Sequence, residues 1–320
     1  MITFLEEANR IKDELITIRR DLHEHPELGF EEKRTSEKIK EFLTKEGIPY
    51  VEVAKTGVCG IIKGEKKDNN RVIGLRADMD ALPIQDKKVC SYSSKVPGKM
   101  HACGHDGHMA IGLGVAKWLM ENKNSSLKGV IKLIFQPAEE GVRGAKPIAE
   151  SGILDDVDYF ACGHLGCDIP SGVIVAAPER YLSTLKMDLR FKGKAAHAGM
   201  EPHAGKNALL AACNATIQIL SLPTHGEGMT RANVGVLNAG EGRNVIPSYA
   251  QMQIEVRGEN EKINNYMTEE ALRRARGVAL SFDVDLETEV MGEAVDFIPD
   301  DEMTDYITEV AQTIPAVKKV

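Results

Sequence analysis

Apolar and polar positions along the first half of the chain follow two different spacings. The first 22 residues and the stretch 31–46 show the 3.6-residue spacing of amphipathic helices, and Pro26 ends the first of them. A third helix is predicted at 109–121. Short apolar runs, typical of buried strands, occupy residues 57–63, 72–76, 129–136 and 159–163. This alternation of strands and helices predicts an α/β domain with a mixed, largely parallel sheet.

The pattern changes from about residue 183 onward. The predicted elements are, in order, a strand at 184–193, a helix at 205–220, strands at 231–240 and 249–258, a helix at 261–279 and a strand at 282–290. This βαββαβ order is typical of a small, self-contained two-layer unit. We therefore predict two domains, one made of residues 1–182 and 293–320, and one made of the inserted residues 183–292.

The length of the chain indicates the number of domains, and its charge excludes some kinds of partner. A chain of 320 residues is longer than one hydrophobic core usually serves, which fits two domains. The formal net charge is −8 with acidic and basic residues interleaved, so the chain lacks the basic stripe that nucleic acids and anionic membranes require. No apolar run reaches membrane-spanning length, and charges from Glu6 onward argue against a signal peptide. We expect neither a nucleic acid nor a membrane as partner.

The cysteines and histidines point to a metal. The six cysteines form no CxxC pair, so no disulfide framework is indicated and a reducing cytoplasm is the expected location. Of only nine histidines, His101, His105 and His108 fall in the stretch MHACGHDGH, together with Cys103 and Asp106. Thiolate, imidazole and carboxylate groups are the donors that a borderline divalent ion such as zinc accepts. This stretch therefore predicts metal ligands.

Polar side chains also follow three of the predicted strands. They are Asp78 and Asp80, Glu139 and Glu140, and His164. Ligands of α/β sheets bind outside the carboxyl ends of the strands, so we expect these groups to gather at one edge. Of two adjacent glutamates, one can coordinate a metal while the other moves protons to and from water and a leaving amine. The implied reaction is metal-assisted hydrolysis.

Each of these residues also has a simpler interpretation. An isolated Glu-Glu pair is usually a solvated loop, and a single cysteine is usually a buried apolar thiol. His101 and His108 fit a structural role beside a metal as well as ligation. Asp78 and Asp80 also suit turns, and His23 suits the end of the first helix.

Six stretches of the chain, in order, resemble one family. They are RRDLHEHPELGFEE, LRADMDALP, MHACGHDGH, IFQPAEEG, GKAAHAGMEPHAGKNAL and GRNVIP. They extend from Arg19 to Pro247 and resemble the amidohydrolase branch of the dinuclear metallopeptidase superfamily, which includes glutamate carboxypeptidase, aminoacylase and hippurate hydrolase. Within that branch, the runs VDYFACGH, GKNALLAA, EGMTRANVGVLNAGEGRNVIP and MGEAV are most similar to one of the subunits of p-aminobenzoyl-glutamate hydrolases.

The resemblance implies roles for residues of the first domain. It makes Cys103, His105, Glu140 and His164 ligands of two divalent ions, manganese or zinc, per complete active site. It makes Glu139 the general base. Asp80 corresponds to a carboxylate that lies behind the ligands, orients one of them and raises its basicity.

The resemblance makes residues 183–292 a dimerisation domain. His197 is then expected to reach an active site, commonly that of the partner subunit, and to stabilise the oxyanion of the reaction. Asn244 is expected to contact the substrate, and Arg257 is a candidate for binding its carboxylate. The expected assembly is a homodimer, or a heteromer with a related subunit.

The implied function is a metal-dependent amidohydrolase that cleaves the amide bond of an N-acyl or N-aroyl amino acid, with p-aminobenzoyl-glutamate as the expected substrate. A broader, hippurate-type N-acyl-amino-acid deacylase and a non-catalytic binding subunit remain alternatives. Retention of every motif through GRNVIP favours an enzyme. The family also has a further histidine near its C-terminus, whereas no histidine follows His225 here, so we expect the C-terminal part of the catalytic domain to be missing.

Overall fold

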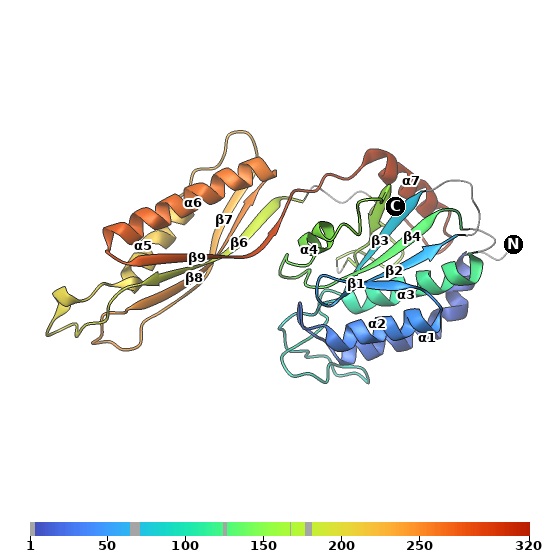
Figure 1. Ribbon diagram of the computed structural model, residues 1–320, viewed down its shortest axis with the longest axis horizontal. Coiled ribbons are helices and arrows are strands. Elements are labelled where there is room, and N and C mark those ends of the chain that lie inside the picture. The colour runs from blue at the N-terminus through green and yellow to red at the C-terminus, as the bar shows by residue number, and fades with distance from the viewer. Residues whose placement is uncertain (1–3, 65–70, 124–126, 167, 177–180) are drawn as a thin grey trace. The chain divides into compact units, whose positions relative to one another are not determined.

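The computed structural model describes residues 4–64, 71–123, 127–166, 168–176 and 181–320. The chain divides into two compact units, which we describe separately (Figure 1). Unit 1 comprises Met1–Val175 and Thr308–Val320, and unit 2 comprises Ala176–Ile307. The domain limits expected from the sequence, 182/183 and 292/293, fall at the first residue of strand β6 and near the end of strand β9.

Unit 1 contains a five-stranded mixed sheet in the order β1-β2-β4-β3-β5. The strands are β1 (Tyr50–Val53), β2 (Gly57–Lys63), β3 (Val72–Asp78), β4 (Val130–Gln136) and β5 (Tyr159–Cys162). β1, β2 and β4 pair antiparallel, whereas β3 runs parallel to both β4 and β5. The sequence prediction missed β1, because this strand has four residues and three of them are exposed.

Three helices of unit 1 cover one face of its sheet (Figure 1). They are α1 (Phe4–Glu24), α2 (Lys33–Lys45) and α3 (His105–Asn122), and a short helix, α4 (Ala145–Glu150), packs through Ile148 on the other face. Alternate residues of β4 point to the two faces, with Phe135 toward α3 and Ile134 toward α4. Burial on both faces explains why β4 reads as an uninterrupted apolar run.

Unit 2 has the βαββαβ order that the sequence predicts. Its strands are β6 (Ser183–Lys192), β7 (Thr230–Ala239), β8 (Tyr249–Gly258) and β9 (Asp285–Ala294), and they form an antiparallel sheet in the order β7-β8-β6-β9. The helices are α5 (Ala208–Leu220) and α6 (Glu261–Ser281), and α7 (Asp301–Gln312) follows β9. Asparagine side chains cap α5 and α6, since Asn207 accepts the N–H of Leu210 and Asn260 accepts that of Ile263.

The core of unit 2 is apolar. Alanines of α5, such as Ala211 and Ala215, are fully buried against Leu189, Phe191 and Met252 of the sheet. Small side chains on the helix allow its close approach to the sheet. None of the helices in the described part of the chain is long and apolar enough to cross a membrane.

Candidate metal centre

The carboxyl ends of three parallel strands meet at one edge of the unit 1 sheet. β3 lies between β4 and β5 and runs in the same direction as both. Asp78 is the last residue of β3, and Glu139 and Glu140 follow the end of β4. His164 follows β5, and α3 begins with His105. The sequence predicted this helix from residue 109, because its first turn consists of polar and glycine residues.

Possible ligand atoms form three groups at this edge, each with its atoms within 4.8 Å of one another. The groups are Cys103, His105 and His164; Asp78, His105 and His108; and His105, Glu139 and Glu140. The Cys103 Sγ lies 3.3 Å from the His164 Nε2. The His105 Nε2 lies 3.9 Å from the Glu139 carboxylate and 4.0 Å from the Glu140 carboxylate. All four predicted ligands and the predicted base therefore lie together, with His105 common to every group.

His105 presents one free nitrogen to this cluster. Its buried ring donates through Nδ1 to the Asp80 carbonyl oxygen at 2.8 Å, while Nε2 has no hydrogen-bond partner among the described residues. Burial acts to lower the pKa of His105, but hydrogen bonding with Asp80 and the charges of Asp78 and Glu139 outweigh it and raise that pKa to about 9. The surrounding carboxylates therefore favour a positive charge at this position.

Cys103 responds to the same negative charge. Burial, followed by the charge of Glu140, raises the pKa of the Cys103 thiol to about 12. Burial and the charge of Glu139 likewise raise the pKa of Glu140. A cation bound between the Cys103 thiol and the Glu140 carboxyl would favour the ionised form of both groups, and the ionised forms are good metal ligands.

Two buried carboxylates fix the backbone of the turn that carries the glutamate pair. Asp80 accepts the N–H of Glu139 at 2.9 Å and the N–H of Glu140 at 3.0 Å. Glu32, which is fully buried, accepts the N–H of Ala138 at 2.9 Å and the hydroxyl of Thr56 at 2.6 Å. Burial raises the pKa of Glu32. Glu32 was not predicted as a site residue, although it lies in the RRDLHEHPELGFEE stretch.

The turn itself is strained and tightly packed. Ala138 is buried and has a φ of 50°, in the left-handed region that favours glycine. A Cβ at Gly29 would lie 2.9 Å from the Ala138 Cα, so the loop before α2 can approach the turn only as glycine. Neighbouring Glu27 accepts the N–H groups of Arg34 and Thr35 at the start of α2.

Asp78 and His108 form a buried pair beside the cluster. The Asp78 Oδ1 lies 2.5 Å from the His108 Nδ1, and its Oδ2 lies 3.0 Å from an Arg76 guanidinium nitrogen. Burial acts to raise the pKa of Asp78, but the hydrogen bond from His108 and the charge of Arg76 outweigh it and hold that pKa well below its usual range. Asp78 is thus the last residue of a strand and part of an ion pair rather than a turn residue.

His101 lies outside the three groups of ligand atoms. It is buried, and burial lowers its pKa to about 4. The nearby His23 lies in the last turn of α1, and its Nδ1 lies 2.7 Å from the buried carboxylate of Asp106. Arg19 contacts the same carboxylate at 2.7 Å. This second polar layer ties the first helix to the start of α3.

The remaining predicted residues belong to unit 2. His197 is exposed, and its Nδ1 accepts the N–H groups of Gly199 and Met200 at 3.2 and 3.1 Å. The Ala198 N–H donates to the Asn244 carbonyl oxygen at 2.9 Å, which places the His197 and Asn244 loops side by side. Arg257 lies at the other end of β8 and pairs with Glu255 at 3.0 Å. Unit 2 therefore brings His197 and Asn244 together, but not Arg257.

Comparison with known proteins identifies the family. The model of peptidase family M20/M25/M40 matches residues 74–319. A homolog of one subunit of p-aminobenzoyl-glutamate hydrolase, from Haemophilus influenzae, is 51% identical over 257 residues, which are 78% of this chain and 60% of that protein.

Two of the solved structures that are similar to this chain show the extent of the match. The aminobenzoyl-glutamate utilization protein from Klebsiella pneumoniae has a TM-score of 0.86 and 34% identity, and the match covers 99% of this chain and 85% of that one. A dinuclear metal-binding M20 peptidase from Bacillus subtilis has a TM-score of 0.72 and 32% identity, with 98% and 82% covered. The chain, which gathers possible metal-ligand groups at the carboxyl edge of a mixed sheet, belongs to peptidase family M20/M25/M40.

Proposed function

We propose that this chain is a metal-dependent amidohydrolase that cleaves the amide bond of an N-acyl or N-aroyl amino acid. The observation that carries the proposal is the gathering of five side chains at one sheet edge of an M20 chain. They are Cys103, His105, Glu139, Glu140 and His164. The His105 Nε2, which has no hydrogen-bond partner among the described residues, and the two carboxylates of Glu139 and Glu140 near it mark a place where a cation would be stabilised.

Cys103, His105, Glu140 and His164 would hold the metal. Thiolate and imidazole donors suit zinc, and a carboxylate among them also suits manganese. By analogy with the dinuclear relative, we propose two ions per complete site. Bound there, divalent ions supply positive charge that polarises the amide carbonyl and makes a water molecule more acidic.

Glu139 is the proposed proton carrier. Its side chain is 36% exposed, so it can reach solvent and substrate while Asp80 fixes its backbone. It takes a proton from the attacking water as the new C–O bond forms, and it gives that proton to the amine as the C–N bond breaks. Glu140, at 23% exposed, is more enclosed and suits a ligand.

His197 and Asn244 of unit 2 are proposed to bind the substrate. An imidazole N–H from His197 would stabilise the negative charge that develops on the carbonyl oxygen. The proposed partner is a second copy of the chain or a related protein, since the Haemophilus relative is named after one component of a multi-subunit enzyme. Arg257 is the candidate for holding a substrate carboxylate, although its pairing with Glu255 opposes this role.

Mixed dimers test whether His197 acts in its own chain or in its partner. Glu139→Gln chains and His197→Ala chains, each inactive alone, are combined and their mixed dimers verified. We expect activity to return in part, because one site of the mixed dimer then has an intact Glu139 and an intact His197. No recovery would assign His197 to the site of its own chain.

The proposed substrate is p-aminobenzoyl-glutamate, and the proposed location is the cytoplasm. The names of the Haemophilus and Klebsiella relatives support the substrate. The five cysteines of the described residues are all free, which fits a reducing compartment.

The test combines metal binding with hydrolysis. Metal-free protein is titrated with Zn²⁺ or Mn²⁺ and assayed for release of glutamate from p-aminobenzoyl-glutamate and of glycine from benzoylglycine. We expect hydrolysis that requires the ion and is faster for p-aminobenzoyl-glutamate. Equal rates would favour the broader deacylase, and substrate binding without hydrolysis in metal-loaded protein would favour a non-catalytic binding role.

A further inference from the structure

His108 has an imidazole side chain and lies where a further metal ligand could be expected. It lies in the first turn of α3, three residues after His105, and is 5% exposed. Together with Asp78 and His105 it forms one of the three groups of possible ligand atoms. The hydrogen bonds of its ring, however, indicate a different role.

Both ring nitrogens of His108 already have partners. The Leu165 N–H donates to the Nε2 at 2.9 Å, so this nitrogen carries no proton. The ring proton is therefore on Nδ1, 2.5 Å from the Asp78 carboxylate that accepts it. Coordination of a metal through Nε2 would break the bond to Leu165, and coordination through Nδ1 would break the bond to Asp78.

Asp78 is itself held in place from the strand. It is 1% exposed, and its second oxygen lies 3.0 Å from the Arg76 guanidinium. The Arg76 Nε in turn donates to the Gln136 side chain at 2.9 Å, which joins β3 to β4. His108 thus connects a fixed carboxylate on β3 to the backbone that follows β5.

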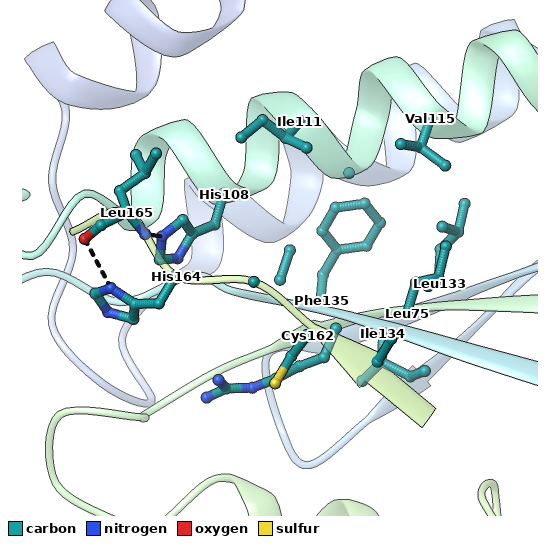
Figure 2. A pocket seen from close by; sticks show the side chains of 15 residues that line it. Leu75, His108, Ile111, Val115, Leu133, Ile134, Phe135, Cys162, His164 and Leu165 are labelled. Atoms are coloured by element: carbon teal, nitrogen blue, oxygen red, sulfur yellow. Dashed lines mark hydrogen bonds between the residues drawn. The ribbon is translucent and has the colours of Figure 1, made fainter. Parts of the chain in front are cut away.

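That backbone carries His164. The His164 Nδ1 donates to the Leu165 carbonyl oxygen at 2.9 Å, which leaves the Nε2 at 3.3 Å from the Cys103 Sγ. Figure 2 shows both hydrogen bonds, one between His108 and the Leu165 backbone nitrogen and one between His164 and the Leu165 carbonyl oxygen. The Leu165 side chain packs on α3, where a Cβ at Gly107 would lie 2.7 Å from the Leu165 Cδ1.

We propose that His108 is a positioning residue and not a ligand. It links Asp78 to the Leu165 N–H and thereby holds His164 beside Cys103, ready to bind a metal. This inference rests on the proposed metal centre. Residues that orient ligands from behind typically contribute about 10- to 100-fold to metal affinity.

Two substitutions separate positioning from ligation. His108→Gln keeps an amide oxygen that can accept from Leu165, but it removes an imidazole ligand. His108→Leu removes both hydrogen bonds. Leu113→Ala is the matched control, because Leu113 is buried on the same helix and its truncation destabilises α3 without touching Leu165.

The experiment has two readouts on the 320-residue chain. The first is hydrogen exchange of the Leu165 amide in metal-free protein. The second is a titration with Co²⁺, whose thiolate charge-transfer and d–d absorption report Cys103 and the number of imidazoles. We expect His108→Leu to expose the Leu165 amide and to weaken Co²⁺ binding by about 10- to 100-fold. His108→Gln and Leu113→Ala should keep the protection and most of the affinity.

Two results would overturn the inference. One is protection of the Leu165 amide that His108→Leu leaves unchanged. The other is a loss of Co²⁺ affinity and of one imidazole's absorption in His108→Gln as large as in His108→Leu, because that pattern identifies a ligand. If the unsubstituted chain gives no thiolate band with Co²⁺, the proposed metal centre is wrong. The inference about His108 is then wrong as well, even if the exchange results are as expected.

Discussion

The two units of the chain place their polar groups in opposite ways. At the carboxyl edge of unit 1, Asp78, Asp80 and His105 are almost completely buried, and Glu32 lies behind them. In unit 2 the core is apolar, and the candidate residues His197 and Asn244 are exposed. Buried charged groups destabilise a fold unless each is paired, and in unit 1 Asp78 is paired with His108 and Arg76, while Asp80 accepts two backbone N–H groups. Among its described residues unit 2 buries a single carboxylate, Asp188, which contacts Gln251 and Arg190. Its exposed loops suit a scaffold that presents side chains.

The largest expected effect distinguishes the loss of the general base from the loss of a metal ligand in unit 1. Glu139→Gln should lower turnover by about 10²- to 10⁴-fold, because the general base is lost while the ligands remain. Metal content, measured by elemental analysis, should stay near normal. Glu140→Gln is the matched comparison, since it should lose metal. Near-normal turnover in Glu139→Gln would assign the proton transfer to another group.

A core substitution in unit 2 should destabilise that unit alone. Phe191 is fully buried among apolar side chains, and Phe191→Ala should lower the free energy of unfolding by about 3–5 kcal/mol. Urea denaturation measures the loss, and Zn²⁺ affinity should be unchanged. A comparable truncation in unit 1, Leu133→Ala, should weaken both stability and metal binding, since Leu133 lies on the strand that leads to the glutamate pair. Weaker Zn²⁺ binding in Phe191→Ala would mean that the units are energetically coupled.

Metal binding should in turn stabilise unit 1 and not unit 2. At a free Zn²⁺ concentration of about 100 times Kd, the gain is about 2.7 kcal/mol. Hydrogen exchange should show slower exchange in β3, β4 and α3, with the amides of β6 and β8 unaffected. Equal slowing in both units would contradict the assignment of the ligands to unit 1.

The smallest expected effect concerns pH. Burial raises the pKa of Glu32 in the folded chain, so its contribution to stability is fully present below the unfolded pKa and is lost as the pH rises through the folded value. Glu32→Gln removes this loss while keeping an acceptor for the Ala138 N–H. The stability of Glu32→Gln relative to the unsubstituted chain should therefore increase as the pH rises from about 4 to about 7, as denaturation at each pH would show. A difference that stays constant with pH would mean that the Glu32 pKa is not raised.

The sequence predicts elements well where one periodicity prevails. β4 reads as a strand because both faces are buried, and α5 and α6 read as helices because their apolar stripes are long. The α3 start at His105 was missed by four residues, because ligand chemistry replaces the helical pattern there. The gathering of Cys103 and Glu140 followed from the rule that parallel strands end at one edge.

Other features of the site could be recognised only in the structure. Nothing in the sequence says that Glu32 reaches the Ala138 N–H or that His108 spans Asp78 and Leu165, because these contacts join segments far apart along the chain. The expected ligand, base and substrate roles remain predictions for the variants above.

The close approach of Gly29 to Ala138 has an evolutionary consequence. Both the Cα and the Cβ of Ala138 lie 2.9 Å from where a Cβ at position 29 would be, so trimming residue 138 to glycine would not make room for a side chain. A larger residue at position 29 is therefore blocked unless the whole turn before Glu139 moves, and a turn that moves would carry the glutamate pair with it. Relatives that keep this turn should keep glycine at position 29, whereas a relative with a larger residue there should have rebuilt its active site.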